Sequence, residues 1–401
     1  MALSPGVFQL KGVVQPYSWG GHDYIPQLLG HANETKTPAA EYWMGAHPNH
    51  PSTLPEKNGI TLVQLIEEAP KDVLGETVEI QYGSLPYLLK VLDVRQMLSI
   101  QVHPDKASAE KGYEEEDKKN IDLKRADRNY KDRNHKPEMA VALGDFWLLH
   151  GFKNEEALDK ILHDVPEFAE LLPFWESGSY RGLYELVMQL PQHEVDRILA
   201  PLVERVSPLY EQELLQKTSE DFWAARAVQS FCRNGQLDRG IFSIYFFNVL
   251  HLHDGEGIYQ PAGLPHAYLE GQNVEIMANS DNVLRAGLTD KHIDVPELMK
   301  HVRFEATNPQ VIRPAEGMHQ VFPSAAREFE LHRYRLAAGE KATVDTATAE
   351  LFLVLEGSVE LRSAEGALTL LKGGVALALA NRQIELVAEE AADVFRVTVP
   401  R

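Results

Sequence analysis

Short apolar runs broken by proline and glycine fill the first part of the chain. Tyr87–Leu92 and Met139–Leu143 are two examples. Runs of this length between turn residues are typical of β-strands. The pattern therefore predicts a β-rich region from Phe8 to Gly151.

The spacing of apolar residues changes between Asn154 and Arg233 to intervals of three and four. It does so in the segments 155–158, 183–190, 194–206 and 219–231. This periodicity predicts amphipathic helices. An apolar run typical of a strand returns at Ile241–Phe247. We therefore expect a helical insert that interrupts a β-domain and shapes one wall of its cleft.

A further β-region is predicted from Val321 to Arg401. Its apolar segments at 351–355, 359–361 and 394–399 are separated by turns such as Glu356-Gly357. Many short strands without alternating helices favour an antiparallel barrel or sandwich. The fold class that we predict is mainly β, with a helical insert and a second β-domain at the C-terminus.

Composition limits the architecture and the partners. A chain of 401 residues exceeds one typical core, so two or three domains are expected. The formal charge of -20 repels nucleic acid and anionic membranes. A small anionic substrate would need a local cationic pocket.

Cys232 is the only cysteine, which excludes an intramolecular disulfide and zinc fingers built on cysteine. The segment 1–6 lacks the basic and apolar regions of a signal peptide, and no run of about 18 apolar residues occurs. We therefore expect a soluble cytoplasmic protein.

The segment Leu98–Asp105 alternates apolar residues with residues of useful chemistry. In a strand, Ser99, Gln101 and His103 would share one face. An imidazole nitrogen and a carboxamide oxygen are both capable metal ligands. The segment therefore resembles half of a metal site.

Two later segments offer the other half. His135–Val141 alternates so that Lys136 and Glu138 share a face, and His266 follows a constrained turn that begins at Pro261. Each of these residues alone is more simply explained as structural or solvated. Their repetition on otherwise apolar strands favours a divalent-metal site with a position open to substrate.

Two charged segments allow two interpretations each. Glu275–Thr289 is either a polar turn or the carrier of a functional guanidinium, Arg285, that holds phosphate or developing negative charge. Glu114–Lys136 is most simply a solvated loop with helical turns, and a lid over the site is the alternative.

Together these segments resemble a known family. The chain is similar to the type I mannose-6-phosphate isomerases, zinc enzymes built on cupin barrels. The similarity is carried by the blocks Gln15–Gly20, Trp43–Pro48, Leu98–Lys106, His135–Leu143, Pro261–Leu269 and Glu275–Thr289. It spans essentially the whole chain and departs modestly from the family pattern at Gln260 and Leu264.

The resemblance implies roles for individual residues. It implies one zinc ion per chain, held by Gln101, His103, Glu138 and His266. It implies Arg285 and Lys136 as catalytic residues. Ser99, Lys90 and Lys291 fall where phosphate contacts are placed in the family.

The resemblance also implies an architecture and a reaction. We expect a jelly-roll catalytic domain at 1–152 and 234–320, a helical domain at 153–233 and a metal-free jelly-roll-like domain at 321–401. The expected enzyme is a monomer that interconverts mannose 6-phosphate and fructose 6-phosphate through an enediol. The base that moves the proton stays open between Lys136, His47, Asp281 and zinc-bound hydroxide, while His135 should point away.

Two rivals use the same fold. An iron(II) dioxygenase would need two histidines and a carboxylate, against which Gln101 argues mildly. A non-catalytic sugar-binding protein would keep the fold and the ion without turnover. The full set of Lys136, Glu138, His266 and Arg285 argues against it.

Overall fold

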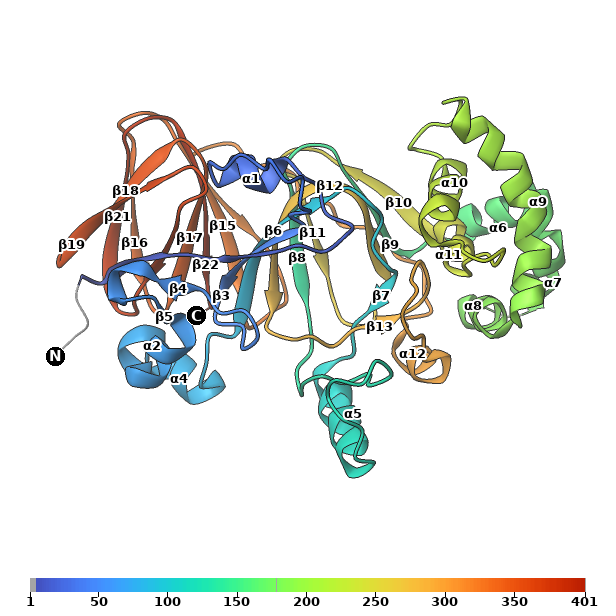
Figure 1. The fold of residues 1–401 in the computed structure, drawn as a ribbon, viewed down its shortest axis with the longest axis horizontal. Helices are drawn as coiled ribbons and strands as arrows, with labels where there is room; N and C mark the ends of the chain where they lie inside the picture. The colour runs from blue at the N-terminus through green and yellow to red at the C-terminus, as the bar shows by residue number, and fades with distance from the viewer. Residues whose placement is uncertain (1–4, 178, 401) are drawn as a thin grey trace.

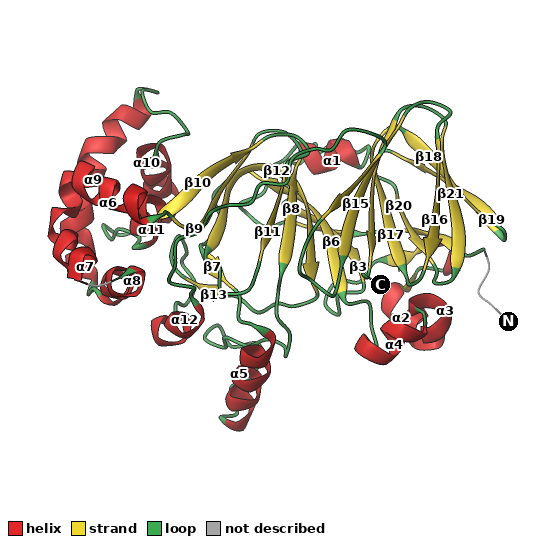
Figure 2. Ribbon diagram, turned by 180° about the vertical axis from the view of Figure 1, so that it is seen from behind, coloured by secondary structure: helices red, strands yellow, loops and turns green. Residues whose placement is uncertain are grey.

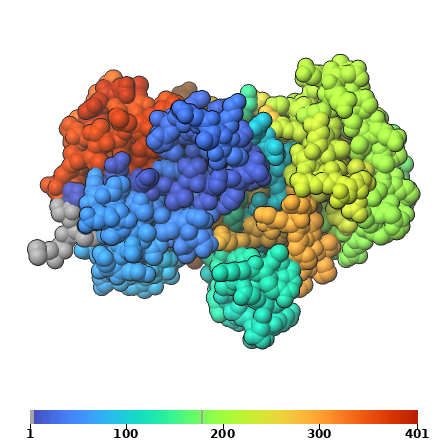
Figure 3. Space-filling model, in the orientation of Figure 1, coloured from blue at the N-terminus to red at the C-terminus, as the bar shows by residue number. Residues whose placement is uncertain are grey.

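The computed structural model describes residues 5–177 and 179–400. Three parts lie in a row: a helical lobe, a central β-region and a C-terminal pair of sheets (Figure 1). A small lobe around helix α5 (Lys106–Lys118) projects from the central part, and the space-filling view shows it clearly (Figure 3).

The central ten-stranded sheet holds both halves of the predicted site. Its main path, in order, is β10 (Phe247–Leu252), β9 (Phe146–Phe152), β12 (His266–Ala278), β6 (Tyr87–Val94), β3 (Glu41–Gly45) and β2 (Val13–Gln15). Four further strands join it: β7 (Gln101–Val102), β8 (Glu138–Ala142), β11 (Gly257–Gln260) and β13 (Leu284–Arg285).

Strand β12 connects the two halves of this region. Its first residues pair with β9 and β7, and its later residues pair with β6 and β8. The register shifts between Tyr268 and Glu270, and Gly271 follows at φ 115°. A Cβ at Gly271 would lie 2.2 Å from the carbonyl oxygen of Asp145. Only glycine therefore allows β12 to pass so close to the backbone of Asp145.

The helical lobe agrees with the predicted insert. Its helices are α6 (Glu155–Asp164), the 3-10 helix η2 (Pro166–Leu171), α7 (Leu172–Ser177), α8 (Tyr180–Gln189), α9 (Gln192–Glu211) and α10 (Glu220–Phe231). Asn154 and Ser219 cap two of them through side-chain oxygens. One continuous core joins these helices to β9 and β12.

The strand predicted at Ile241–Phe247 is wrong. Gly240–Phe246 forms helix α11, and all seven of its residues are buried. An apolar run without a polar face has no periodicity that separates a buried helix from a buried strand. Its burial between the lobe and the central sheet explains the uniform sequence.

Two packed antiparallel sheets make up the C-terminal part (Figure 2). The larger sheet has the order β1 (Val7–Leu10), β20 (Val375–Ala378), β17 (Glu350–Glu356), β22 (Ala392–Thr398), β15 (Glu330–Leu336) and β14 (His319–Phe322). The smaller sheet has the order β16 (Lys341–Thr346), β21 (Arg382–Ala388), β18 (Ser358–Ser363) and β19 (Gly366–Leu371). The predicted strands of this region are confirmed.

The first strand of the chain belongs to this C-terminal part. Val7 of β1 pairs with Ala378 of β20 across an antiparallel ladder. A second core, which includes Phe8 and Phe395, joins the larger sheet to β3, β6 and β12. The domain boundaries inferred from sequence stay a prediction.

Shorter elements cover the ends of the sheets. They are α1 (Tyr24–Leu28), β4 (Thr53–Leu54), η1 (Pro55–Lys57), β5 (Ile60–Thr61), α2 (Leu62–Glu68), α3 (Pro70–Leu74), α4 (Glu76–Tyr82) and α12 (Val295–His301). No helix among the described residues is long and apolar enough to cross a membrane.

The segment Glu114–Lys136 is largely solvated, as expected, but a few of its residues are buried at its base. It contains the end of α5 and a loop whose Arg128 is buried and lies 3.1 Å from Glu116. The Tyr130 hydroxyl donates to Glu297 of α12 at 2.6 Å. The lobe is therefore anchored at its base by buried polar contacts.

Candidate active site

Three candidate residues form a row across neighbouring strands. Gln101 of β7 lies directly opposite His266 of β12 on one side and Arg285 of β13 on the other. Residues directly opposite in an antiparallel ladder project to the same face. The sheet therefore brings together two of the predicted metal ligands and the predicted catalytic arginine.

His103, Glu138 and His266 converge as a possible metal centre. Their ligand atoms lie within 4.8 Å of one another, and all three residues are buried. Nε2 of His103 is 3.5 Å from Oε1 of Glu138, and Nε2 of His266 is 3.2 Å from Oε2. Zinc bonds of about 2.0–2.1 Å in tetrahedral geometry place neighbouring ligand atoms about 3.3 Å apart, so this spacing fits.

Backbone contacts aim both imidazoles at the centre. Nδ1 of His103 donates to the carbonyl oxygen of Asn282 at 2.8 Å, and Nδ1 of His266 donates to that of Leu264 at 3.0 Å. A carbonyl only accepts, so each Nδ1 carries the proton and each Nε2 keeps its lone pair. Nε2 of His103 is buried without a hydrogen-bond partner, as expected of an atom that binds a metal.

The charge states of the cluster suit a cation. Burial lowers the pKa of His103 to about 4, so the ring is neutral at neutral pH. Burial alone would raise the pKa of Glu138, but Lys136 and His103 outweigh it and hold that pKa well below its usual value. Neutral imidazole and carboxylate are the forms that ligate metals.

Lys136 shares the surface of Glu138, as the alternation predicted. Its Nζ lies 2.9 Å from Oε1 of Glu138. His135 turns away and contacts Glu328, with 2.7 Å between its Nε2 and Oε1 of that residue. Since Nζ faces a carboxylate that is also a candidate ligand, Lys136 is placed as a hydrogen-bond donor beside the metal centre.

A buried ionic network of Glu41, Lys90 and Glu275 lines the cavity next to Glu138 and His266. Nζ of Lys90 is 3.1 Å from Oε1 of Glu275 and 3.3 Å from Oε2 of Glu41, whose carboxylate also accepts from Nε1 of Trp43 at 2.5 Å. Burial lowers the pKa of Lys90, but the carboxylates outweigh that effect and raise it. Two carboxylates already balance this ammonium, which weakens Lys90 as a phosphate contact.

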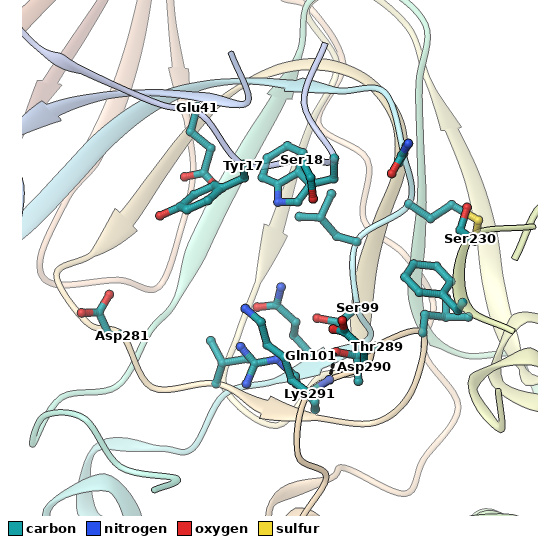
Figure 4. Close-up of a pocket in the computed structure, with 18 of the residues that line it drawn as sticks. Tyr17, Ser18, Glu41, Ser99, Gln101, Ser230, Asp281, Thr289, Asp290 and Lys291 are labelled. Carbon is teal, nitrogen blue, oxygen red and sulfur yellow. Dashed lines mark hydrogen bonds between the residues drawn. The ribbon is translucent and has the colours of Figure 1, made fainter. Parts of the chain in front are cut away.

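A pocket of about 480 Å³ connects these groups (Figure 4). Gln101 and Lys136 line it, and both also line a smaller chamber of about 50 Å³ that reaches Glu138 and His266. The metal cluster therefore lies at the inner end of the pocket.

The other predicted substrate residues lie along the same pocket. Arg285, Lys291 and Ser99 all line it. Neither Arg285 nor Lys291 forms an ion pair with another described residue. Burial lowers the pKa of Arg285, and burial together with the Arg285 charge lowers that of Lys291. Asp290 in the same wall offsets part of this charge, and the remaining excess of positive charge favours an anion.

The helical insert supplies part of the pocket wall, as expected. Ser230, Phe231 and Arg233, at and just beyond the end of α10, line the pocket, and Figure 4 shows Ser230 in its wall. Nη1 of Arg233 lies 4.0 Å from Oδ2 of Asp290. Sequence reasoning missed Arg233, because nothing in its local pattern distinguishes it from other charged residues of the insert.

Asp281 forms another part of the wall, with His47 behind it. Nε2 of the buried His47 is 3.3 Å from Oδ1 of Asp281, and Nδ1 of His47 accepts from the backbone N–H of Asn49 at 3.3 Å. Burial raises the pKa of Asp281, but the hydrogen bond from His47 outweighs it, with help from Lys136. The pocket therefore presents an oriented, ionised carboxylate.

Comparison with known proteins identifies the family of the chain. The sequence model of one protein family, the phosphomannose isomerase type I catalytic domain, matches residues 7–155. Mannose-6-phosphate isomerase of Escherichia coli is 36% identical over 93% of this chain and 95% of its own length, and that of Mus musculus is 33% identical over 99% and 97%. The chain belongs to the mannose-6-phosphate isomerase family.

Solved structures of this family agree in fold. Mannose 6-phosphate isomerase from Salmonella typhimurium, bound to fructose 6-phosphate and zinc, superimposes with a TM-score of 0.88 at 33% identity. The match covers 99% of this chain and all of that one. Membership of this family selects the isomerase over the iron dioxygenase and the non-catalytic sugar-binding protein.

Proposed function

We propose that the chain is a zinc-dependent isomerase that interconverts mannose 6-phosphate and fructose 6-phosphate. The observation that carries this proposal is one pocket with a metal-ligating cluster at its inner end and unpaired cations along its wall. A phosphorylated sugar presents hydroxyl and carbonyl oxygens at one end and a dianion at the other. The two ends of the pocket match the two ends of that substrate.

Gln101, His103, Glu138 and His266 would hold one zinc ion. Gln101 is included because it lies opposite His266 in the ladder and lines the same inner chamber. When bound, zinc supplies a Lewis acid that polarises the oxygens on C1 and C2 of the sugar. The partner-free, buried Nε2 of His103 supports the assignment.

Lys291 and Ser99 bind the substrate phosphate, and Arg233 of the insert adds a third contact. Guanidinium groups suit a phosphate because they donate two parallel hydrogen bonds. Asp290 lies beside Arg233 and balances part of the positive charge while the pocket is free. Binding energy from this end positions the reacting carbons at the other.

Isomerisation moves one proton between C1 and C2 and a second between the oxygens on those carbons, through an enediolate that two side chains help to form. The carboxylate of Asp281, oriented by His47, takes the proton from one carbon and returns it to the other. Lys136 donates a hydrogen bond to the oxygen that gains negative charge in the enediolate. Arg285 adds positive charge along the same wall.

A coupled assay with mannose 6-phosphate tests the proposal. The zinc-loaded chain should release fructose 6-phosphate, and a chelator should abolish turnover until zinc is restored. Elemental analysis should find one zinc per chain. The absence of chelator-sensitive turnover in the zinc-loaded protein would refute the proposal.

The same proposal covers the setting of the enzyme. The partner is a small sugar phosphate, and the charge of -20 disfavours nucleic acid and anionic membranes. We propose a monomer in the cytoplasm, where the lone Cys232 stays reduced. Sedimentation at micromolar concentration measures the oligomeric state.

A further inference from the structure

A second group of potential metal ligands lies on the surface of the central β-region. It consists of Asp145, His251 and His253, whose ligand atoms lie within 4.8 Å of one another. His251 is in β10, His253 follows that strand, and Asp145 immediately precedes β9. None of the three lines the substrate pocket.

Both imidazoles converge on one carboxylate oxygen. Oδ1 of Asp145 lies 2.8 Å from Nε2 of His251 and 3.5 Å from Nδ1 of His253. Tetrahedral zinc spaces its ligand atoms at about 3.3 Å, so small side-chain rotations suffice to admit an ion. The separations resemble those of the His103, Glu138 and His266 cluster, where the corresponding values are 3.5 and 3.2 Å.

The histidines are held in place before any ion arrives. His251 lies opposite Trp147 in the β10–β9 ladder, and their rings stack at 4.1 Å and 7°. The ring of His253 packs against that of His251 at 4.2 Å. The backbone N–H of His253 donates to Oε2 of Glu256 at 2.9 Å, which fixes the chain at this point. Such restraint reduces the entropy lost on binding.

Other exposed pairs of histidine and carboxylate differ from this group. His163 contacts Asp159 and His193 contacts Glu194, with a single imidazole in each case. Two imidazole nitrogens with one carboxylate favour zinc, nickel or copper over magnesium or calcium, which prefer oxygen ligands.

We infer that Asp145, His251 and His253 bind a divalent transition-metal ion, separately from the active site. Three protein ligands leave at least one coordination position to water. Since two of the ligands are well exposed, with side-chain exposures of 75% for Asp145 and 63% for His253, the ion exchanges freely with solvent. A bound ion would clamp the turn before β9 to the end of β10.

Calorimetric titration with Ni²⁺ tests the inference, with the full chain first dialysed until one zinc per chain remains. We expect a binding event in addition to the zinc already present. His253→Ala and Asp145→Asn should each weaken it at least about tenfold, because each removes one of three ligands. His163→Ala, which removes a single exposed histidine elsewhere, should leave it unchanged.

Further measurements separate this site from the active site. Turnover of mannose 6-phosphate should stay unchanged in both surface variants, which also shows that they fold. His266→Ala should keep the Ni²⁺ event even though it loses active-site zinc. Electron paramagnetic resonance of added Cu²⁺ should show coupling to two imidazole nitrogens. No additional event, or an event unaffected by both surface substitutions, would overturn the inference, whatever the fate of the proposed function.

Discussion

Asp238 accepts a hydrogen bond of 2.7 Å from the backbone N–H of Leu288, fifty residues further along the chain. The same carboxylate accepts from the backbone N–H of Thr289 at 3.2 Å and from that of Gly240 at 2.7 Å. A Cβ on Gly287 would lie 2.4 Å from Cα of Gly240, so the two backbones touch. One side chain thus links the end of the helical insert to the loop that follows Arg285.

Asp238→Ala should therefore loosen the phosphate end of the pocket. Three backbone donors lose their acceptor, and Lys291 loses its fixed position. We expect KM for mannose 6-phosphate to rise about tenfold, with a smaller change in kcat. Steady-state kinetics of this variant and of Asp159→Ala, an exposed control on α6, provide the comparison. Unchanged KM in Asp238→Ala would contradict this role for the loop.

Substitution of two histidines, one inside the metal cluster and one outside it, tests the metal centre. His266→Ala removes a proposed ligand, so the purified variant should carry little zinc and turn over at least about a thousandfold more slowly. His135→Ala is the matched control, because His135 contacts Glu328 instead of the cluster. It should keep its zinc and most of its activity. Elemental analysis and the coupled assay give both readouts.

Arg285→Lys distinguishes a role of Arg285 in turnover of the substrate from a role in binding the metal. The substitution keeps a positive charge but loses the planar fork of donors. We expect kcat to fall by about 10²–10³ while zinc content stays at one per chain. Loss of zinc in proportion to activity would show that Arg285 supports the metal centre instead.

Arg233→Gln tests the contribution of the helical insert. If Arg233 contacts phosphate, KM for mannose 6-phosphate should rise several-fold with kcat nearly unchanged, since a remote contact acts on binding. The inhibition constant for inorganic phosphate should rise in parallel. Arg197→Gln removes a guanidinium on α9 that pairs with Glu170, and it should change neither value.

His332 makes the stability of the C-terminal part sensitive to acid. Burial, with the charge of Arg396, lowers its pKa to about 3. In the unfolded chain the imidazole of a histidine has a pKa near 6.5. At a pH between about 3 and 6.5, His332 therefore binds a proton in the unfolded state but not in the native state. The free energy of unfolding therefore falls as the pH drops, by about 2 kcal/mol at pH 5 from this group.

His332→Gln removes this titration, and His332 is remote from the metal cluster. Urea unfolding of the metal-free proteins at about pH 7.5 and pH 5 should show a smaller acid loss in the variant. His103 and His150, whose pKa burial likewise lowers, contribute equally to both proteins, so the difference reports on His332 together with His319, whose Nε2 lies 2.9 Å from Nδ1 of His332. An identical acid loss in the two proteins would rule out its contribution.

Sequence patterns predicted elements in which two kinds of side chain recur at a regular interval. The helical spacing of 219–231 reflects one buried face, whereas the alternation around Glu138 is one of side-chain chemistry, because all five residues of β8 are buried; both elements form as expected. Gly240–Phe246 was misassigned because it is buried on every side. Only two residues of the expected strand at Leu98–Asp105, Gln101 and Val102, pair as a strand, yet the predicted face is kept.

The site was predictable where ligand chemistry repeats along a strand and less so where it depends on distant contacts. His103 and His266 stand out because imidazoles are rare on apolar strands. Glu41 and Glu275 gain meaning only from Lys90, which the sheet places between them. The sequence around Asp238 gives no signal of its role, since the backbone N–H of Leu288 that donates to its carboxylate lies fifty residues away.

The pairing of β1 with β20 sets the order in which this molecule can be completed. Val7 is synthesised 371 residues before its partner Ala378. During synthesis the edge of β1 has no native strand to pair with, although the central strands already have their neighbours. Full closure of the larger C-terminal sheet therefore waits until β20 has been synthesised, and a chain truncated before β20 would keep an open, aggregation-prone edge.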